Sequence, residues 1–96
     1  MMAGYVYIMS NRKGGPLYTG VTANLPARIF QHRNGEGSTF CKRYGLTRLV
    51  YCEDHARIDD AIAREKQIKK WRRVWKVNLI EAINPEWDDL YLTLNH

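Results

Sequence analysis

Residues 5–21 have the sequence YVYIMSNRKGGPLYTGV, in which two β-branched and aromatic runs flank a polar segment. Tyr5–Met9 has the composition of a well-buried strand, and Leu17–Val21 is a second strand candidate. The intervening residues 10–16 are polar and end in Gly-Gly-Pro, which is typical of a turn. This stretch therefore predicts a β-hairpin.

The hairpin places candidate functional side chains on one face of the sheet. Alternate residues of a strand point the same way, so Tyr5, Tyr7 and Met9 share a face, as do Tyr18 and Gly20 in the partner strand. Strand pairing can then place Tyr7 beside Tyr18, while Gly20 leaves space for another backbone or a ligand phosphate. Paired tyrosines also occur in ordinary cross-strand packing, so the hairpin alone leaves both explanations open.

Further elements are predicted downstream of the hairpin. Asn24 is a good N-cap residue and Pro26 is tolerated in a first turn, which predicts a short helix from Leu25 to about Arg33. The elements expected after it are a loop over residues 34–44, a strand over 49–53, and helices over about 58–70 and 72–83 that stop at Asn84-Pro85.

This order of elements predicts an α/β fold with a small, largely antiparallel three-stranded sheet flanked by helices. No repeat, low-complexity tract or linker interrupts the chain. We therefore expect a single domain over residues 1–96, with a core over about 4–83 and a C-terminal extension over 84–96. Such a small core favours a shallow, open site over a deep pocket for a large organic cofactor.

Arg28 and His32 lie four residues apart in the first predicted helix and are neighbours on one helical face. They flank the apolar stripe of Leu25 and Ile29, so they lean toward the sheet. A guanidinium there can hold phosphate oxygens bidentately. The roles open to His32 are binding a phosphate, transferring a proton, or packing as a structural imidazole bonded to the backbone.

Glu65 lies near the centre of the apolar stripe of the helix predicted over residues 58–70. A carboxylate at such a position is costly unless it is paired or bound to a metal. One explanation is an ion pair with a nearby Arg. The other is Mg²⁺ held by one carboxylate, waters and substrate phosphate oxygens, with Asn78 or Asn84 in support.

The chain is basic, with 15 Lys and Arg against 10 Asp and Glu and a formal net charge of +5. Residues 64–76 contain seven basic residues and a single acid, which suits a surface that meets a polyanion. Trp71 and Trp75 are interleaved with them; their spacing favours core packing, whereas exposed rings would suit stacking on bases or sugars. A solvated helix face is the other explanation for the charges. The basic residues expected to bind nucleic acid here are Lys69, Lys70, Arg72 and Arg73.

Other classes of protein are disfavoured. Cys41 and Cys52 have neither CxxC spacing nor the number needed for a disulfide framework, so both are expected to be reduced packing residues. Residues 1–10 lack an export signal, and no apolar run approaches the ~20 residues of a membrane span. We therefore expect a cytoplasmic protein that does not engage a membrane.

Together these residues resemble the GIY-YIG nuclease superfamily, and most strongly its small single-domain bacterial members of the UPF0213 type. The resemblance covers nearly the whole chain. Tyr5, Val6 and Thr19 are variants of the signature, which keeps both tyrosines and Gly20. The motifs that carry it are Tyr5-Val6-Tyr7, ten intervening residues, Tyr18-Thr19-Gly20, Arg28-x-x-x-His32, Glu65 to Trp71, and Asn84-Pro85-Glu86-Trp87-x-Asp89-Leu90.

The resemblance implies a GIY-YIG-like sandwich and a divalent-metal-dependent endonuclease that hydrolyses phosphodiester bonds of DNA, structure-selective or nonspecific, in repair or recombination. It implies that Tyr18 is the general base or the phenol that positions water, with Tyr7 as its orienter. It also implies that Arg28 stabilises charge on the phosphate.

The same resemblance implies that His32 contacts the phosphate or assists proton transfer and that Glu65 holds Mg²⁺ or Mn²⁺. Asn84, or else Asn78, would support the metal, and Gly20 would lie at the bound strand. The alternative is a module that keeps the fold but hydrolyses weakly, binding nucleic acid or recruiting a partner. The expected partners are DNA, with RNA as an alternative, and a protein for targeting, with the chain a monomer or weak dimer.

Overall fold

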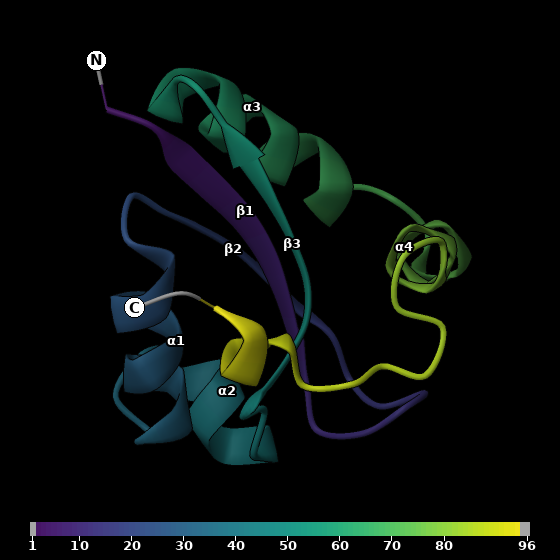
Figure 1. Ribbon diagram of the computed structural model, residues 1–96. Coiled ribbons are helices and arrows are strands. Elements are labelled where there is room, and N and C mark those ends of the chain that lie inside the picture. Colours follow the sequence, from purple (N-terminus) through teal and green to yellow (C-terminus); the bar gives the residue numbers. More distant parts are fainter. Residues whose placement is uncertain (1, 95–96) are drawn as a thin grey trace.

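The computed structural model describes residues 2–94. Helices cover both faces of a central sheet, α3 and α4 on one face and α1 and α2 on the other (Figure 1). This is the α/β fold with a three-stranded sheet that the sequence predicts. In chain order the elements are β1 (Gly4–Ser10), β2 (Tyr18–Thr22), α1 (Leu25–Arg33), α2 (Thr39–Tyr44), β3 (Arg48–His55), α3 (Ile58–Lys69), α4 (Arg73–Glu81) and the 3₁₀ helix η1 (Leu90–Thr93).

The sheet is antiparallel throughout, in the order β2-β1-β3. In the predicted hairpin Tyr7 pairs with Gly20 and Met9 pairs with Tyr18, so the two tyrosines are diagonal neighbours. On the other side of β1 the register shifts between Ile8 and Met9, where β3 carries an extra residue. Because β1 is the central strand, β2 and β3 are the two edges of the sheet.

The alternation of β1 divides the core into two clusters. Val6 and Ile8 pack against α3 and α4, in a cluster that includes Ile68. Tyr7 and Met9 pack on the opposite face, in the cluster that includes residues of α1 and α2. All four β1 side chains are fully buried, so this short strand is the shared layer between the two halves of the domain.

The first helix begins and ends where the sequence predicts, because its cap is local. Asn24 Oδ1 accepts a hydrogen bond from the Ala27 backbone N–H at 3.2 Å. The third strand is longer than expected, whereas α4 is shorter than the predicted helix over 72–83. Both cysteines are free, as expected. None of the helices within residues 2–94 is long and apolar enough to cross a membrane.

The prediction of a loop over residues 34–44 is wrong, because α2 occupies Thr39–Tyr44. Ser38 is its N-cap residue, and its hydroxyl accepts from the Cys41 backbone N–H at 3.5 Å. Cys41 is the one buried residue of this helix. Six residues with a single buried side chain have no apolar period, so the pattern that predicts longer helices was missing here.

The two tryptophans of the basic segment differ in burial. Trp71 packs partly buried against the cluster under α3 and α4, whereas Trp75 is 51% exposed. Core packing is therefore correct for Trp71 and wrong for Trp75. The i, i+4 spacing does not decide burial here because Trp71 lies between two helices and not inside one.

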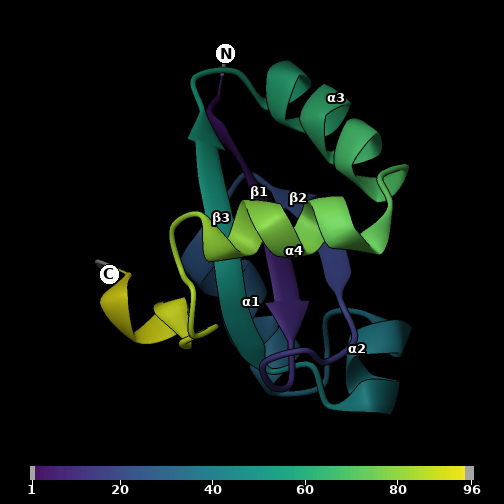
Figure 2. The same ribbon diagram turned by 90° about the vertical axis from the view of Figure 1, so that its right-hand side faces the viewer.

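The segment after α4 returns to the outer edge of β3 (Figure 2). Trp87 is 1% exposed within the core, so the core extends beyond residue 83. Buried Asn84 donates from Nδ2 to the Val50 carbonyl and the Asp88 carbonyl, each at 2.9 Å, and accepts from the Asp88 backbone N–H at 3.0 Å. Asp89 Oδ1 accepts from the Leu49 backbone N–H at 3.1 Å. These side chains satisfy backbone groups of an edge strand that otherwise lack partners.

Asn84→Ala should lower the free energy of unfolding by about 2–3 kcal/mol, because it leaves the buried Val50 carbonyl without its partner. The matched control is Asn78→Ala, at an exposed position of α4, which should change stability by no more than about 0.5 kcal/mol. Urea denaturation measures both. Equal stability of the two variants would contradict the role of Asn84 in satisfying the backbone groups at the edge of β3.

Candidate active site

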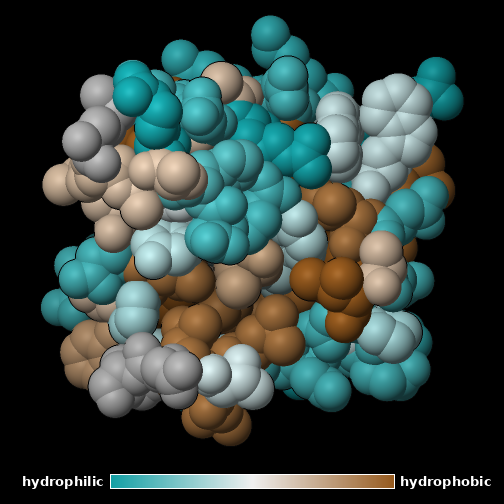
Figure 3. Space-filling view, turned by 45° about the horizontal axis from the view of Figure 1, so that its top comes forward, coloured by the Kyte–Doolittle hydropathy of each residue, from teal (hydrophilic) through white to brown (hydrophobic). Residues whose placement is uncertain are grey.

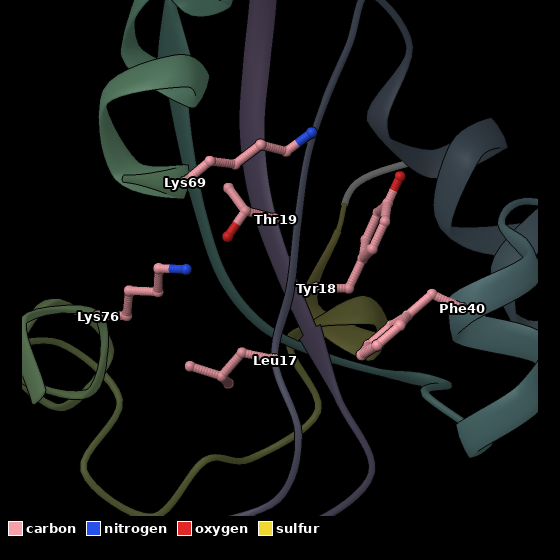
Figure 4. A pocket seen from close by; sticks show the side chains of 6 residues that line it. All are labelled: Leu17, Tyr18, Thr19, Phe40, Lys69 and Lys76. Atoms are coloured by element: carbon pink, nitrogen blue, oxygen red, sulfur yellow. The ribbon is translucent and has the colours of Figure 1, made fainter. Parts of the chain in front are cut away.

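A hollow of about 290 Å³ wraps around β2, the outer strand of the hairpin. Figure 4 shows Tyr18 and Phe40 on one side of the strand, and Thr19, Leu17, Lys69 and Lys76 on the other. The side chains on the two sides come from different layers of the domain, α2 on one side and α3 and α4 on the other. An edge strand is thin enough for both layers to reach the same opening.

Tyr18 is half-buried within an aromatic group. Its ring centroid lies 6.3 Å from that of Tyr7, 5.5 Å from the edge-on His32 ring, and 6.3 Å from Phe40, which is inclined by 27°. These contacts fix the direction of the phenol. The Arg28 guanidinium interacts with the Tyr18 phenol. Tyr18 also lines the hollow, where a water or substrate oxygen can reach it.

Tyr7 is fully buried beneath this group. Arg28 Nε donates to its hydroxyl oxygen at 3.3 Å, and His32 Nε2 lies 2.8 Å from the same oxygen. Burial raises the pKa of Tyr7 to about 12, although Arg28 acts in the opposite direction. Tyr7 therefore keeps its proton near neutral pH, and that proton can be donated to the imidazole.

Gly20 does not provide the open space that the sequence suggests. A Cβ at this position would lie 2.5 Å from Tyr7 Cζ and from its hydroxyl oxygen. The Tyr7 ring itself fills the space above the glycine. The prediction that Gly20 leaves room for a ligand is thus wrong, and its place in the site is to let Tyr7 cross β2 and reach α1.

His32 is 1% exposed, and its Nδ1 atom has no hydrogen-bond partner among the described residues. The Gly37 backbone closes over the ring, since a Cβ there would lie 2.3 Å from Nδ1. Burial, with a smaller contribution from the Arg28 charge, lowers the pKa of His32 to about 4. The imidazole is thus neutral and bonded to Tyr7, neither to the backbone nor to the surface where a phosphate would bind.

Arg28 lies half-buried at the mouth of this network. Its Nη1 donates to Gln31 Oε1 at 3.2 Å, and its hydrogen bond to Tyr7 raises the pKa of the guanidinium. The guanidinium also interacts with the Tyr18 phenol, and a guanidinium has five N–H donors in all. Arg28 is therefore held in place at one end and retains donors for an anion.

Glu65 is 8% exposed on α3, and its Oε2 lies 2.7 Å from Lys69 Nζ. The sequence suggested an Arg as the pairing partner; the partner is the lysine one turn later. Because Lys69 also lines the hollow, it links the buried carboxylate to the open site. Within residues 2–94 no cluster of three or more His, Cys, Asp or Glu side chains could hold a metal.

A cation here would thus depend on Glu65 together with waters and substrate oxygens, the manner in which Mg²⁺ is often held. Neither candidate asparagine lies at the hollow. Asn84 is engaged at the opposite edge of the sheet, and Asn78 lines a different hollow on α4. The prediction that Asn84 supports the metal is wrong, because its amide nitrogen and oxygen bind the backbone of Val50 and Asp88.

The predicted basic residues divide by position. Lys69 lines the hollow, while Lys70 and Arg72 are exposed nearby in sequence. Arg73 instead donates from Nη2 to the Gly14 and Gly15 carbonyls at 3.0 and 2.7 Å, which fastens α4 to the hairpin turn. Phe40 and Lys76 were missed by sequence reasoning: α2 was not expected, and the basic cluster gave no reason to single out Lys76.

Comparisons with known proteins identify the family of this chain. The GIY-YIG catalytic domain family matches residues 3–78. A UPF0213 protein of Staphylococcus haemolyticus is 40% identical over 81 residues, 84% of this chain and 98% of the relative. A UPF0213 protein of Clostridium perfringens is 42% identical over 78 residues, 81% of this chain and 83% of the relative.

A solved structure is also similar. The solution NMR structure of the UPF0213 protein BH0048 from Bacillus halodurans has a TM-score of 0.58 and 30% sequence identity, and the match covers 92% of this chain and 93% of that one. The two tyrosines, the arginine and the buried glutamate lie within the matched range 3–78. The chain belongs to the GIY-YIG catalytic domain family, a family of nuclease-like, nucleic-acid-binding domains, and to its UPF0213 branch.

Proposed function

We propose that this protein is a divalent-metal-dependent endonuclease that hydrolyses phosphodiester bonds of DNA. The observation that carries the proposal is the hollow around β2, which brings the Tyr18 phenol together with Lys69, the partner of the buried Glu65. Branched or flapped DNA in repair or recombination is the proposed setting.

Tyr18 has the task of orienting the attacking water and accepting its proton as negative charge develops. A free phenol, with a pKa near ~10, is a poor base at pH 7. The neighbouring aromatic group holds the ring in one direction, so positioning is the larger part of this task. Tyr7 and neutral His32 lie behind it and fix its surroundings.

Arg28 stabilises the charge that builds on the phosphate. Its Nε is fixed on Tyr7, so the guanidinium meets a phosphate with little loss of side-chain freedom. Lys69 and Lys76 lie on the other side of β2 and contact further phosphate oxygens. Together these cations neutralise a polyanion from both sides of one strand.

Glu65 would hold Mg²⁺ or Mn²⁺, with Lys69 moving from its carboxylate to the substrate backbone. When bound, the cation supplies Lewis-acid stabilisation of the phosphate and the leaving oxygen. A buried carboxylate whose described partner is one flexible, half-exposed lysine fits such a site, since the pair can open without unfolding.

The same ion pair favours a second candidate function. If Lys69 stays on Glu65, the domain would bind nucleic acid or recruit a partner with weak hydrolysis. The cations around β2 serve that function equally well. Cleavage assays separate the two proposals.

Tyr18→Phe and Glu65→Gln should each lower the rate of DNA cleavage by about 100-fold or more, since one removes the catalytic hydroxyl and the other a charged ligand. The assay offers single-stranded, duplex, flap and branched DNA, and RNA, with Mg²⁺, with Mn²⁺, or with EDTA. Cleavage should require the metal and favour DNA. Tyr5→Phe and Glu86→Gln are the matched controls and should keep full activity.

Binding in EDTA should be retained in both catalytic variants, and thermal denaturation checks that they fold. If the wild-type protein binds DNA but cuts no substrate with either metal, the nuclease proposal is rejected and the binding-module proposal remains. Cleavage that survives both substitutions would reject the assigned residues.

The buried imidazole predicts a pH dependence of stability. His32 has an ordinary pKa of 6.5 and a folded pKa of about 4. Between these values the unfolded chain binds the proton and the folded chain does not, so the free energy of unfolding falls as the pH is lowered. The drop is roughly 3 kcal/mol by pH 4, since one pH unit is worth about 1.4 kcal/mol.

His32→Gln removes this titration, and urea denaturation at several pH values from 7.5 to 4 compares it with the wild type. The stability advantage of the wild type should shrink as the pH falls through this range. An advantage that is independent of pH would show that the imidazole is not held neutral by burial.

A further inference from the structure

A second hollow, of about 400 Å³, is lined by Trp71, Trp75, Asn78 and Leu79. Its volume is in the range of small-molecule sites, ~300–1,000 Å³. Trp75, half exposed, contributes a large aromatic surface that the fold itself leaves in water. The proposed chemistry at β2 does not use these residues.

The two indole rings form a corner. Their centroids are 6.3 Å apart and their planes are inclined by 80°. The Arg64 guanidinium carbon lies 5.1 Å from the centroid of the Trp71 ring, and that of Arg72 lies 5.8 Å from the Trp75 ring. Asn78 adds an amide with both donors and an acceptor. A flat, polar-edged heterocycle finds here a stacking face, an edge partner and cations.

The charge around this corner selects for an anionic partner. Arg64 is paired with Glu53, Nε to Oε2 at 3.0 Å, but Arg72 has no acidic partner among residues 2–94. The same holds for Lys70 and Lys76. Figure 3 shows hydrophilic side chains gathered over α3, whose first turn is acidic (Asp59, Asp60) and whose last turn is basic (Lys66, Lys69). The unpaired cations beside the corner attract a polyanion and disfavour a basic or purely apolar protein surface.

The corner and the hollow at β2 share no lining residue, but both draw side chains from α4. Trp75 and Lys76 are adjacent in α4, and Lys76 and Lys69 line the β2 hollow (Figure 4). The α3–α4 junction, which carries Trp71, runs beside the same sheet edge (Figure 2). One strand can therefore contact the lysines with its phosphates and the indoles with a base.

We propose that the Trp71–Trp75 hollow binds an unpaired base of the DNA strand whose backbone contacts Lys69 and Lys76. The inference rests on the proposed function in that the ligand is DNA, and it adds a preference for substrates with a single-stranded segment. Base pairing in a duplex covers the polar edges and stacks the faces, so a duplex cannot occupy the corner without unpairing.

The test measures binding in EDTA, where no cleavage occurs, with a dye-labelled dT12 oligonucleotide and a 12-base-pair duplex. Trp75→Ala should weaken dT12 binding by about 5- to 150-fold, the effect of one lost stacked base. Its duplex affinity should change less than twofold, and its salt dependence should stay that of the wild type, because no phosphate contact is removed. Wild-type Trp fluorescence should be quenched by dT12.

Val74→Ala is the matched control, because Val74 is 55% exposed on the same helix and does not line the hollow. It should leave both affinities unchanged. Equal dT12 affinity of Trp75→Ala and wild type, or equal losses on dT12 and duplex, would overturn the proposal. So would tighter binding of rU12 than of dT12, or sedimentation that shows a dimer dissolved by Trp75→Ala.

The two proposals fail separately. If the protein never cuts DNA but binds dT12 through Trp75, the nuclease proposal is rejected and the base-site proposal stands. If the protein cuts DNA with a metal but Trp75→Ala leaves dT12 binding unchanged, the nuclease proposal stands and the base-site proposal is rejected.

Discussion

The buried Tyr7 hydroxyl, with His32 Nε2 at 2.8 Å and Arg28 Nε at 3.3 Å, is the contact on which the site depends. It ties the central strand to α1 across the bare backbone of Gly20. Water is excluded from it, so the phenol keeps its proton and the imidazole stays neutral. The Tyr18 ring packs on this network, so its direction is set by groups that need not touch a substrate.

The two edges of the sheet have opposite uses. Asn84 and Asp89 seal the outer edge of β3 by binding its backbone groups, which also limits pairing with another chain. At the β2 edge, side chains from both layers meet around one strand. A domain with a small core cannot enclose a deep pocket, and wrapping a site around an edge strand avoids that need.

The layer of α3 and α4 carries charged side chains at the border between the core and the surface. Glu65 is buried because α3 packs its apolar stripe on the sheet, and its one described partner, Lys69, reaches out to the hollow. Beyond Lys69 the chain turns into α4, and Trp71 and Trp75 line a separate hollow. A short helix junction thus carries a carboxylate, a set of cations and an aromatic corner, each in a different environment.

The sequence by itself determined the hairpin, the capped first helix, the tyrosines with Arg28, and the buried acid, because alternation, helical period and caps act between residues close in the chain. Tertiary structure decided the rest. One partner of Asn84 is Val50, 34 residues away. The Tyr7 ring fills the space at Gly20, and the Gly37 backbone covers the His32 ring. The short α2 lacked a period, and the exposure of Trp75 followed from the turn between α3 and α4. Which surfaces are covered depends on long-range packing, and local spacing carries no record of it.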